Sequence, residues 1–377
     1  MKLNTAMFIK SFVGACIAAM ALSLNIEPAY QSQAALEEIL TQTSATTISK
    51  EICQRTATRN KAALPDFYGI LGGATKYTDT DFKHDWSAMA WKDASETYAE
   101  MVPGYKSTVW KRASEAFPGK TLWGSKGITP EDIVQGEVGN CWFISAVSAL
   151  AEKKSRMESV FLNDAASANG IYGVNFYSLG VPHTVIVDDF LPLRKSGTKY
   201  TTTAGGVGVD GSLWGAVLEK AFAKYHGNYF HTNGGSPSTA LKTLHGAPVT
   251  YHTHAEKTLT VDKLWKAIKA ADAAGHMMTA GTPSIPGKNH FDKLANGLSI
   301  SHAFTVLSAH ELKDAKGKTI KLLKIRNPWG KEEYKGPYSD SSKLWTDDLR
   351  KQAGATKNNE GVFFMPIADF KKSFTET

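Results

Sequence analysis

The chain contains little cysteine: three residues in 377, at Cys16, Cys53 and Cys141. So few thiols exclude a disulfide-stapled framework, and the fold must be held together by a hydrophobic core. The apolar fraction of 42% is ordinary for a globular chain and suffices for such a core. The composition is neither collagen-like nor broadly disordered, and the length allows two or three compact units.

Blocks of like charge and long apolar runs are also missing. The net charge is +7, with basic residues interspersed among acidic ones, so we expect no nucleic-acid partner. Internal repeats are not visible. The glycine-rich segment 205–212 lacks the Lys-Ser/Thr of a P-loop and the spacing of a dinucleotide loop, so a phosphate site is not expected there.

Residues 1–34 have the pattern of a signal peptide. Lys2 and Lys10 give a basic start, the apolar run 11–24 is too short for a comfortable membrane span, and residues 32–34 fit a small-x-small cleavage site. We predict a secreted or periplasmic protein without a stable membrane span after cleavage. The alternatives are a retained membrane anchor and a weaker lipoprotein hypothesis through Cys16.

Residues 35–104 differ in composition from the rest, being rich in Thr, Ser and Ala. Leu36, Ile39 and Leu40 share one helical face, and the glycines at 72–73 interrupt the pattern. We interpret this segment as an N-terminal extension or pro-segment. The alternative is a helical decoration packed on the main domain, which is predicted to span 105–375.

The main domain is predicted to be α+β, with a helical first lobe at 105–234 and an antiparallel β second lobe at 235–375. The boundary is placed at the flexible joint 234–237. Helices are expected from periodicity at 141–152, 213–226 and 262–275. Strands are expected at 173–179, 183–189, 302–310, 320–326 and 362–367.

The most informative segment is QGEVGNCWFISAVSAL, which places Cys141 at the start of an apolar helix and Gln135 shortly before it. His302 follows in SHAFTVLSA, and Asn327 in KIRNPWG. A thiol, an imidazole and an amide, widely spaced in sequence, are the parts of a thiol protease site. The thiolate attacks, the imidazole carries the proton, the amide orients the imidazole, and the glutamine N–H helps bind the oxyanion.

Each assignment has a competing interpretation. A thiol at a helix N-terminus is favoured as thiolate, but Cys141 could instead pair with Cys53 as a latency disulfide. His302 competes as the base with other imidazoles, namely His183, His231, His245, His252, His254 and His290. The pair His252 and His254 lacks a third metal ligand at useful spacing, and we interpret it as chance surface placement.

Together these segments resemble the catalytic core of the calpain family of cysteine proteases. Further stretches resemble calpains in matching order, at 108–117, 187–192, 213–229 and 362–374. The resemblance covers roughly 105–375 and implies a two-lobed papain-like fold whose cleft cleaves protein or peptide substrates. It also implies that Trp329 covers the bond between His302 and Asn327. Asn140 departs from the family, where an aspartate is usual.

The N-terminal pattern makes this a bacterial-type secreted member in our interpretation, and we expect a monomer. No cofactor is expected to be required. In calpains each lobe binds calcium, and here Asp132, Glu333, Asp340 and Glu360 fall where the family has ligands or their close equivalents. Ser212 and Val362, however, replace expected carboxylates. Because lost charged ligands weaken calcium binding, we expect millimolar-range dependence at most, with the second-lobe site the better candidate.

Two other functions are compatible with the same four residue types and the same cleft. A non-catalytic peptide-binding or regulatory module could retain the cleft, and a thiol acyltransferase could pass the acyl group to an amine instead of water. The complete Gln/Cys/His/Asn set argues against a decayed site, and an activated thiol at Cys141 would distinguish an enzyme from a binding module.

Overall fold

The computed structural model describes residues 67–90, 108–197, 199–208, 210–331 and 333–377. Contacts group residues 65–180 and 184–377 into one compact unit, and both lobes belong to it. The predicted signal peptide, most of the predicted extension, and Cys16 and Cys53 lie outside the described residues.

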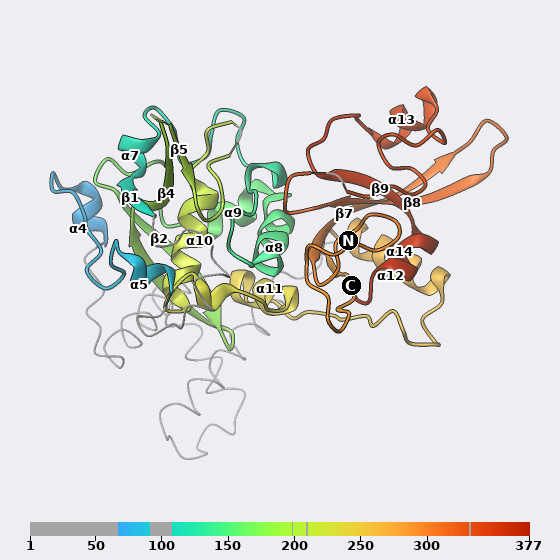
Figure 1. The fold of residues 1–377 in the computed structure, drawn as a ribbon, viewed down its shortest axis with the longest axis horizontal. Helices are drawn as coiled ribbons and strands as arrows, with labels where there is room; N and C mark the ends of the chain where they lie inside the picture. Colours follow the sequence, from blue (N-terminus) through green and yellow to red (C-terminus); the bar gives the residue numbers. More distant parts are fainter. Residues whose placement is uncertain (1–66, 91–107, 198, 209, 332) are drawn as a thin grey trace, which may run out of the picture. The chain divides into compact units, whose positions relative to one another are not determined.

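The first lobe consists of helices and two small sheets, and its helix α8 lies at the edge that faces the second lobe (Figure 1). Its sheets have the strand orders β1-β4-β5 and β2-β3. Its elements, in chain order, are α4 Phe67–Gly72, α5 Trp86–Met89, β1 Val109–Arg112, α7 Ala113–Ala116, η2 Pro130–Asp132, α8 Cys141–Ala151, α9 Lys154–Val160, β2 Ile171–Ser178, β3 Val181–Asp188, β4 Phe190–Ser196, β5 Lys199–Thr202, α10 Trp214–Tyr225, η3 Phe230–Thr232 and α11 Pro237–His245.

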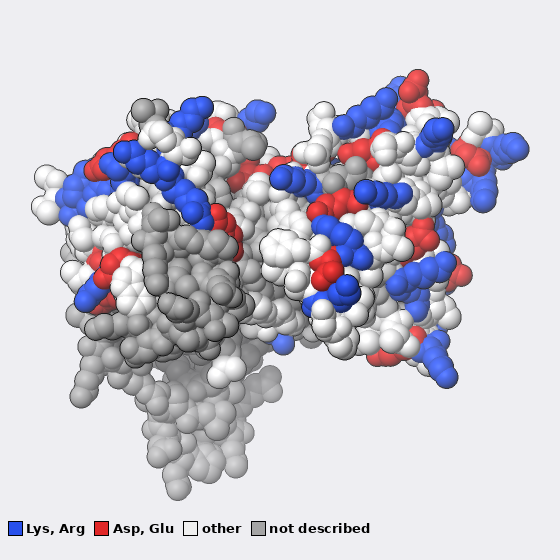
Figure 2. All heavy atoms as spheres, in the orientation of Figure 1, with Lys and Arg blue, Asp and Glu red and all other residues white. Residues whose placement is uncertain are grey.

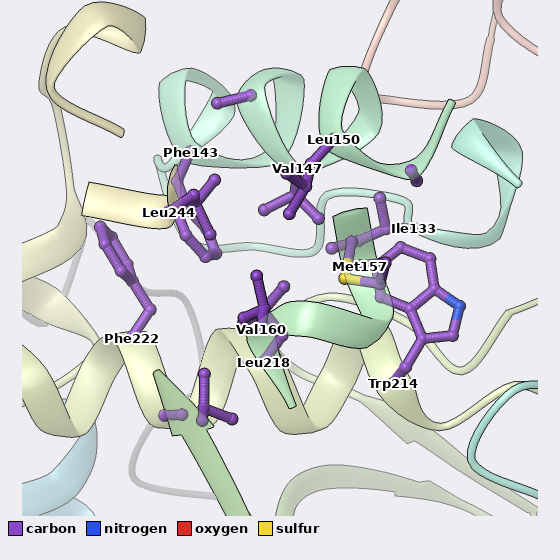
Figure 3. Close-up of a cluster of buried hydrophobic side chains, with 14 of the residues drawn as sticks. Ile133, Phe143, Val147, Leu150, Met157, Val160, Trp214, Leu218, Phe222 and Leu244 are labelled. Carbon is purple, nitrogen blue, oxygen red and sulfur yellow. The ribbon is translucent and has the colours of Figure 1, made fainter. Parts of the chain in front are cut away.

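Helix α8 can be buried on all sides because every residue after Cys141 is apolar except Ser145 and Ser148. Its side chains point toward those of α10 and neighbouring elements (Figure 3). The rings of Phe143 and Phe222 stack with centroids 3.7 Å apart, and Val147 and Leu218 lie in the same cluster. This packing fixes the axis of α8 and with it the position of Cys141.

The second lobe is an antiparallel sheet with strand order β6-β7-β8-β9, packed against helices α12 and α14. Its elements are α12 Val261–Ala273, β6 Thr279–Gly281, β7 Ala303–Lys313, β8 Thr319–Arg326, α13 Asp347–Ala353, β9 Val362–Pro366 and α14 Ile367–Ser373. Thr305 on β7 pairs with Arg326 on β8. Because the strands are antiparallel, the start of β7 lies beside the end of β8, which brings His302 and Asn327 together.

The predicted α+β class is confirmed, and the longer predicted elements match observed ones within a few residues. The short strands β1, β4, β5 and β6 were not predicted, because they are brief or rich in charged residues. The predicted lobe boundary at 235 precedes α11, whose Leu241 and Leu244 pack into the core around α8. The chain therefore leaves the first-lobe core only after His245.

Residues 67–90 pack on the first lobe. The Asp79 N–H and His84 Nε2 each lie 2.7 Å from Oδ2 of Asp188, and Lys224 Nζ lies 2.7 Å from Asp79 Oδ2. Phe82 is buried in a cluster with Tyr229. For residues 67–90, these contacts agree with the second of the two alternatives in the sequence analysis, a segment packed on the main domain. The pro-segment hypothesis for 35–104 stays a prediction.

The surface carries both signs of charge. On the face shown in Figure 2, lysine and arginine side chains are intermixed with aspartate and glutamate side chains over the second lobe. Within the described ranges, no helix combines the length and the apolarity that crossing a bilayer requires.

Candidate active site

A cleft of about 910 Å³ is lined by residues of both lobes. Gln135 and Cys141 line it from the first lobe, and His302 and Trp329 from the second. The structure therefore brings four of the five predicted site residues to one cavity. The fifth, Asn327, is fully buried behind His302.

Cys141 is the first residue of α8 and carries a free thiol that is partly exposed to the cleft. Burial by neighbouring protein atoms raises the pKa of this thiol. Hydrogen bonds from the backbone N–H groups of Ala303, Trp142 and Cys141 itself act in the opposite direction. Helix position alone suggested a thiolate, but desolvation is the larger effect and favours the neutral thiol.

His302 and Asn327 form the second half of the site. His302 Nε2 lies 2.9 Å from Asn327 Oδ1, an oxygen that also accepts the backbone N–H of Trp329 at 3.0 Å. The Trp329 ring lies 4.3 Å from the imidazole, centroid to centroid, and shields that bond from water. Burial lowers the pKa of His302 to about 4. The bond to Asn327 uses Nε2, so Nδ1 is the nitrogen that can exchange a proton in the cleft.

Gln135 is held on the rim of the cleft by two hydrogen bonds. Its backbone N–H donates to the carbonyl of Pro328 at 2.9 Å, and its Nε2 donates to the carbonyl of Val138 at 2.8 Å. The side-chain amide has two N–H bonds, so one remains for a ligand in the cleft. The first contact joins the Gln135 segment directly to the Asn-Pro-Trp segment of the second lobe.

Other contacts between the lobes were not predicted. Thr305 Oγ1 donates to the carbonyl of Ser145 at 2.8 Å. The fully buried Arg326 donates to Ser148 Oγ at 2.8 Å and to the carbonyl of Ile133 at 2.7 Å. These bonds connect α8 and Ile133 to β7 and β8, the strands next to which His302 and Asn327 lie. The sequence contains one sign of these contacts: Ser145 and Ser148 lie one turn apart in an otherwise apolar helix, which indicates polar partners on that face.

The histidine pair at 252 and 254 is not a surface pair. His254 is buried, with Nδ1 2.8 Å from the carbonyl of Phe374 and Nε2 2.7 Å from Thr377 Oγ1. Burial lowers the pKa of His254 to about 4. The expectation of chance surface placement is therefore wrong for His254, which anchors the end of the chain.

The carboxylate of Asp132, the calcium-ligand candidate of the first lobe, makes hydrogen bonds within the protein. Asp132 is buried, and its Oδ2 accepts the backbone N–H of Thr129 at 2.7 Å in a capping box. Burial raises the pKa of Asp132, which disfavours the charged form that binds calcium. The hydroxyl of Ser212 is also buried and has no hydrogen-bond partner among the described residues.

The second-lobe candidates lie in separate contacts. Glu333 pairs with Lys293 and accepts from Ser299 Oγ at 2.8 Å, whereas Glu360 accepts from Thr356 Oγ1 at 2.9 Å. At Asp340, the backbone carbonyl accepts from Arg350 at 2.7 Å. In the part of the chain that the structure describes, no three His, Cys, Asp or Glu side chains converge on one point. The arrangement does not fit a site that holds calcium through several carboxylates.

A cleft lined by a thiol at the start of a helix and by an imidazole, which an amide holds at neighbouring strand ends, defines the class as a papain-like thiol protease fold. The family model described as "Calpain family cysteine protease" matches residues 77–377. The chain therefore belongs to the calpain family of cysteine proteases. The match begins before the predicted domain start at 105 and includes Asp79 and His84.

Similar proteins come from plants and animals. The chain is 31% identical to the calpain-type cysteine protease ADL1 of Oryza sativa over 319 residues, which is 81% of this chain and 14% of that protein. It is 29% identical to mouse calpain-9 over 312 residues (81% and 43%) and to the human calpain-1 catalytic subunit over 315 residues (81% and 42%). The chain thus spans less than half the length of each of these relatives.

Proposed function

We propose that this protein is a cysteine endopeptidase in which Cys141 is the nucleophile and His302 the general base and acid. The observation that carries the proposal is the bond between His302 Nε2 and Asn327 Oδ1, which leaves Nδ1 for proton exchange in the cleft that Cys141 lines. Membership of the calpain family supports the same chemistry.

The proposed acylation begins from a neutral pair. Burial raises the pKa of Cys141 and lowers that of His302, so the imidazole is free to accept the thiol proton. As the sulfur attacks the peptide carbonyl carbon, His302 takes its proton. The imidazolium then donates that proton to the leaving amine, the C–N bond breaks, and a thioester on Cys141 remains. Water attacks the thioester with His302 as base, which releases the acid and restores the thiol.

Asn327, Gln135 and Trp329 serve this cycle without forming bonds to carbon. Asn327 fixes the imidazole orientation through Nε2, and Trp329 keeps water away from that hydrogen bond. The free Nε2 hydrogen of Gln135 and the backbone N–H of Cys141 are proposed to bind the oxyanion of the tetrahedral intermediate. The substrates proposed from the family are proteins or peptides bound in extended form.

The further proposals rest on the sequence pattern. The pattern of residues 1–34 supports a bacterial-type secreted or periplasmic protein, and we propose that it acts as a monomer. Calcium is proposed to bind at most weakly and to have a structural role, without switching the activity on. The direct bonds of Gln135, Thr305 and Arg326 across the lobes support this, because they join the two halves of the site without a metal.

The test combines thiol labelling with a cleavage assay. Iodoacetamide at neutral pH should modify Cys141, and casein digestion followed by mass spectrometry should show cleavage that Cys141→Ala lacks. Adding an amine acceptor distinguishes acyl transfer, which would yield amide products in place of new carboxyl termini. A cleft that only binds peptides would leave casein intact, and its Cys141 would be labelled equally fast in the wild type and in His302→Ala.

A further inference from the structure

Glu219 is a fully buried carboxylate that the proposed chemistry does not use. It lies on α10, and its Oε1 accepts the side-chain N–H of Asn140 at 2.6 Å. Its Oε2 accepts the backbone N–H of Gly205. A buried carboxylate is costly, so one whose two oxygens are both aimed at donors near a reactive group requires an explanation.

The first donor belongs to the residue before the nucleophile. Asn140 is the N-cap of α8, yet its side chain does not cap the helix, which is the usual role of asparagine at that position. Its amide points instead to Glu219, while its backbone carbonyl accepts the N–H groups of Phe143 and Ile144. Glu219 therefore sets the orientation of the turn from which Cys141 projects.

The second donor belongs to the segment behind Gln135. Next to Gly205, the N–H of Gly206 donates to the carbonyl of Val134 at 3.1 Å, and the carbonyl of Thr203 accepts the N–H of Glu137 at 2.9 Å. Segment 203–206 thus bonds to the chain on both sides of Gln135. By holding Gly205 and Asn140 at once, Glu219 links the segment that supports Gln135 to the turn that supports Cys141.

We propose that Glu219 is a positioning residue that fixes the Cys141 sulfur relative to the Gln135 amide through Asn140 and Gly205. The inference rests on the proposed function, since it assumes that the Cys141 thiol and the Gln135 N–H act on the same carbonyl group. The distance between them has to be held closely, because a displacement of about 1 Å in an active site costs on the order of 100-fold in rate.

Removing the acceptors and then restoring the bonds offers a sharp test. In Glu219→Leu both carboxylate oxygens are lost, so the N–H groups of Asn140 and Gly205 are left without an acceptor. In Glu219→Gln both contacts can form: the introduced amide oxygen accepts the N–H of Gly205, and the N–H₂ group donates to Oδ1 of a turned-over Asn140 amide, a buried oxygen that has no partner among the described residues. Glu219→Gln is therefore the conservative variant that keeps both bonds.

The experiment measures kcat and KM on a casein-derived peptide and the rate of Cys141 alkylation by iodoacetamide, in the full chain. Glu219→Leu should lower kcat and the alkylation rate about 10- to 100-fold with KM within about twofold. Glu219→Gln should keep both rates within about threefold of the wild type. The matched control is Glu152→Leu, at the half-buried glutamate that is the C-cap of α8, and it should leave both rates unchanged.

Several outcomes overturn the inference. Unchanged kcat and alkylation in a folded Glu219→Leu would show that the contacts do not position the thiol. A folded Glu219→Gln as slow as Glu219→Leu would show that the two hydrogen bonds are not the cause. If Glu219→Leu does not fold, Asn140→Ala removes one of the two bonds, and unchanged rates in that variant overturn the inference. Failure of the proposed function is separate, because it would be seen as casein cleavage by Cys141→Ala.

Discussion

The two lobes hold their parts of the site by different physical means. In the second lobe, strand register alone brings His302 beside Asn327, because one precedes β7 and the other follows β8. In the first lobe, Cys141 depends on buried polar contacts from distant segments, among them Asn140 to Glu219. A sheet specifies neighbours through its own backbone, whereas a helix end needs side chains from elsewhere to fix it.

The same difference is found in how charge is buried. In the first lobe, Asp188 and Lys220 are both fully buried and paired with each other, and Asp188 also lies within hydrogen-bond distance of His84. The core of the second-lobe sheet is apolar, with Phe304, Leu323 and Phe363 all fully buried. We therefore expect the buried charges around Asp188 to make the first lobe sensitive to single charge changes, and the sheet core of the second lobe to be sensitive to changes in side-chain volume.

The largest expected effect is the loss of activity on replacing Cys141 of the first lobe or His302 of the second, and it should be equally large for both. Cys141→Ala and His302→Ala should each lower kcat/KM for casein peptides by at least about 1000-fold, because the members of such a site act as a unit. The melting temperature should change little in Cys141→Ala, since a small side chain at a helix end is lost. Cys141→Ser is the isosteric control and should be similarly inactive. Appreciable cleavage by Cys141→Ala would refute the thiol mechanism.

The next effect tests how far the first lobe depends on residues 67–90. A chain that begins at Tyr105 loses the bonds of Asp188 to the Asp79 N–H and to His84, the bond of Lys224 to Asp79, and the burial of Phe82. A hydrogen bond to a charged group contributes about 1.5–3 kcal/mol and a buried Phe about as much, so the sum is a large part of the ~5–15 kcal/mol that stabilises a typical domain. We expect this chain to fail to unfold cooperatively in urea, whereas one that begins at Pro65 should do so. A stable and more active shorter chain would instead support the pro-segment hypothesis.

A smaller effect concerns pH and first-lobe stability. Burial raises the pKa of Glu219 from 4.5 to about 7. The folded state holds this proton more tightly than the unfolded chain, so the stabilisation is complete below pH 4.5 and is lost as pH rises through about 7. The free energy of unfolding of the wild type, relative to Glu219→Gln, should fall by roughly 3 kcal/mol over that range.

Urea unfolding at a series of pH values measures this difference. Glu115→Gln, at an exposed glutamate of α7, provides the baseline and should show no comparable slope. A difference between wild type and Glu219→Gln that is flat from about pH 4.5 to 7 would mean that Glu219 titrates as an ordinary exposed carboxyl does.

The smallest expected effect is that of calcium. Because direct hydrogen bonds join the lobes and the candidate carboxylates among the described residues do not converge, micromolar calcium should change kcat/KM by less than about twofold, with any binding in the millimolar range. Calorimetric titration and assays in chelator measure this. Micromolar binding, or activity lost in chelator and regained at micromolar calcium, would restore the regulated behaviour that the family resemblance implies.

Much of the fold and of the candidate site could be predicted because the information is local. Periodicity places Cys141 at the start of an apolar run and puts His302 and Asn327 beside strands, whereas the choice of His302 among the rival histidines rests on the resemblance to calpains. The helix α11 falls within the predicted second lobe, after the joint at 234–237. Glycines and a proline mark a turn there, but only the packing of Leu241 and Leu244 shows which core the helix joins.

The sequence by itself determined the α+β class, the elements that carry the site, and the residue types in it. Only the tertiary structure decided how Glu219 meets Asn140, how Arg326 reaches Ser148 across the lobes, and that burial opposes a charged Cys141. The physical reason is sequence separation. Periodicity and turn chemistry act over a few residues, whereas desolvation and buried hydrogen bonds depend on which distant segments meet, and one chain without its fold does not specify those partners.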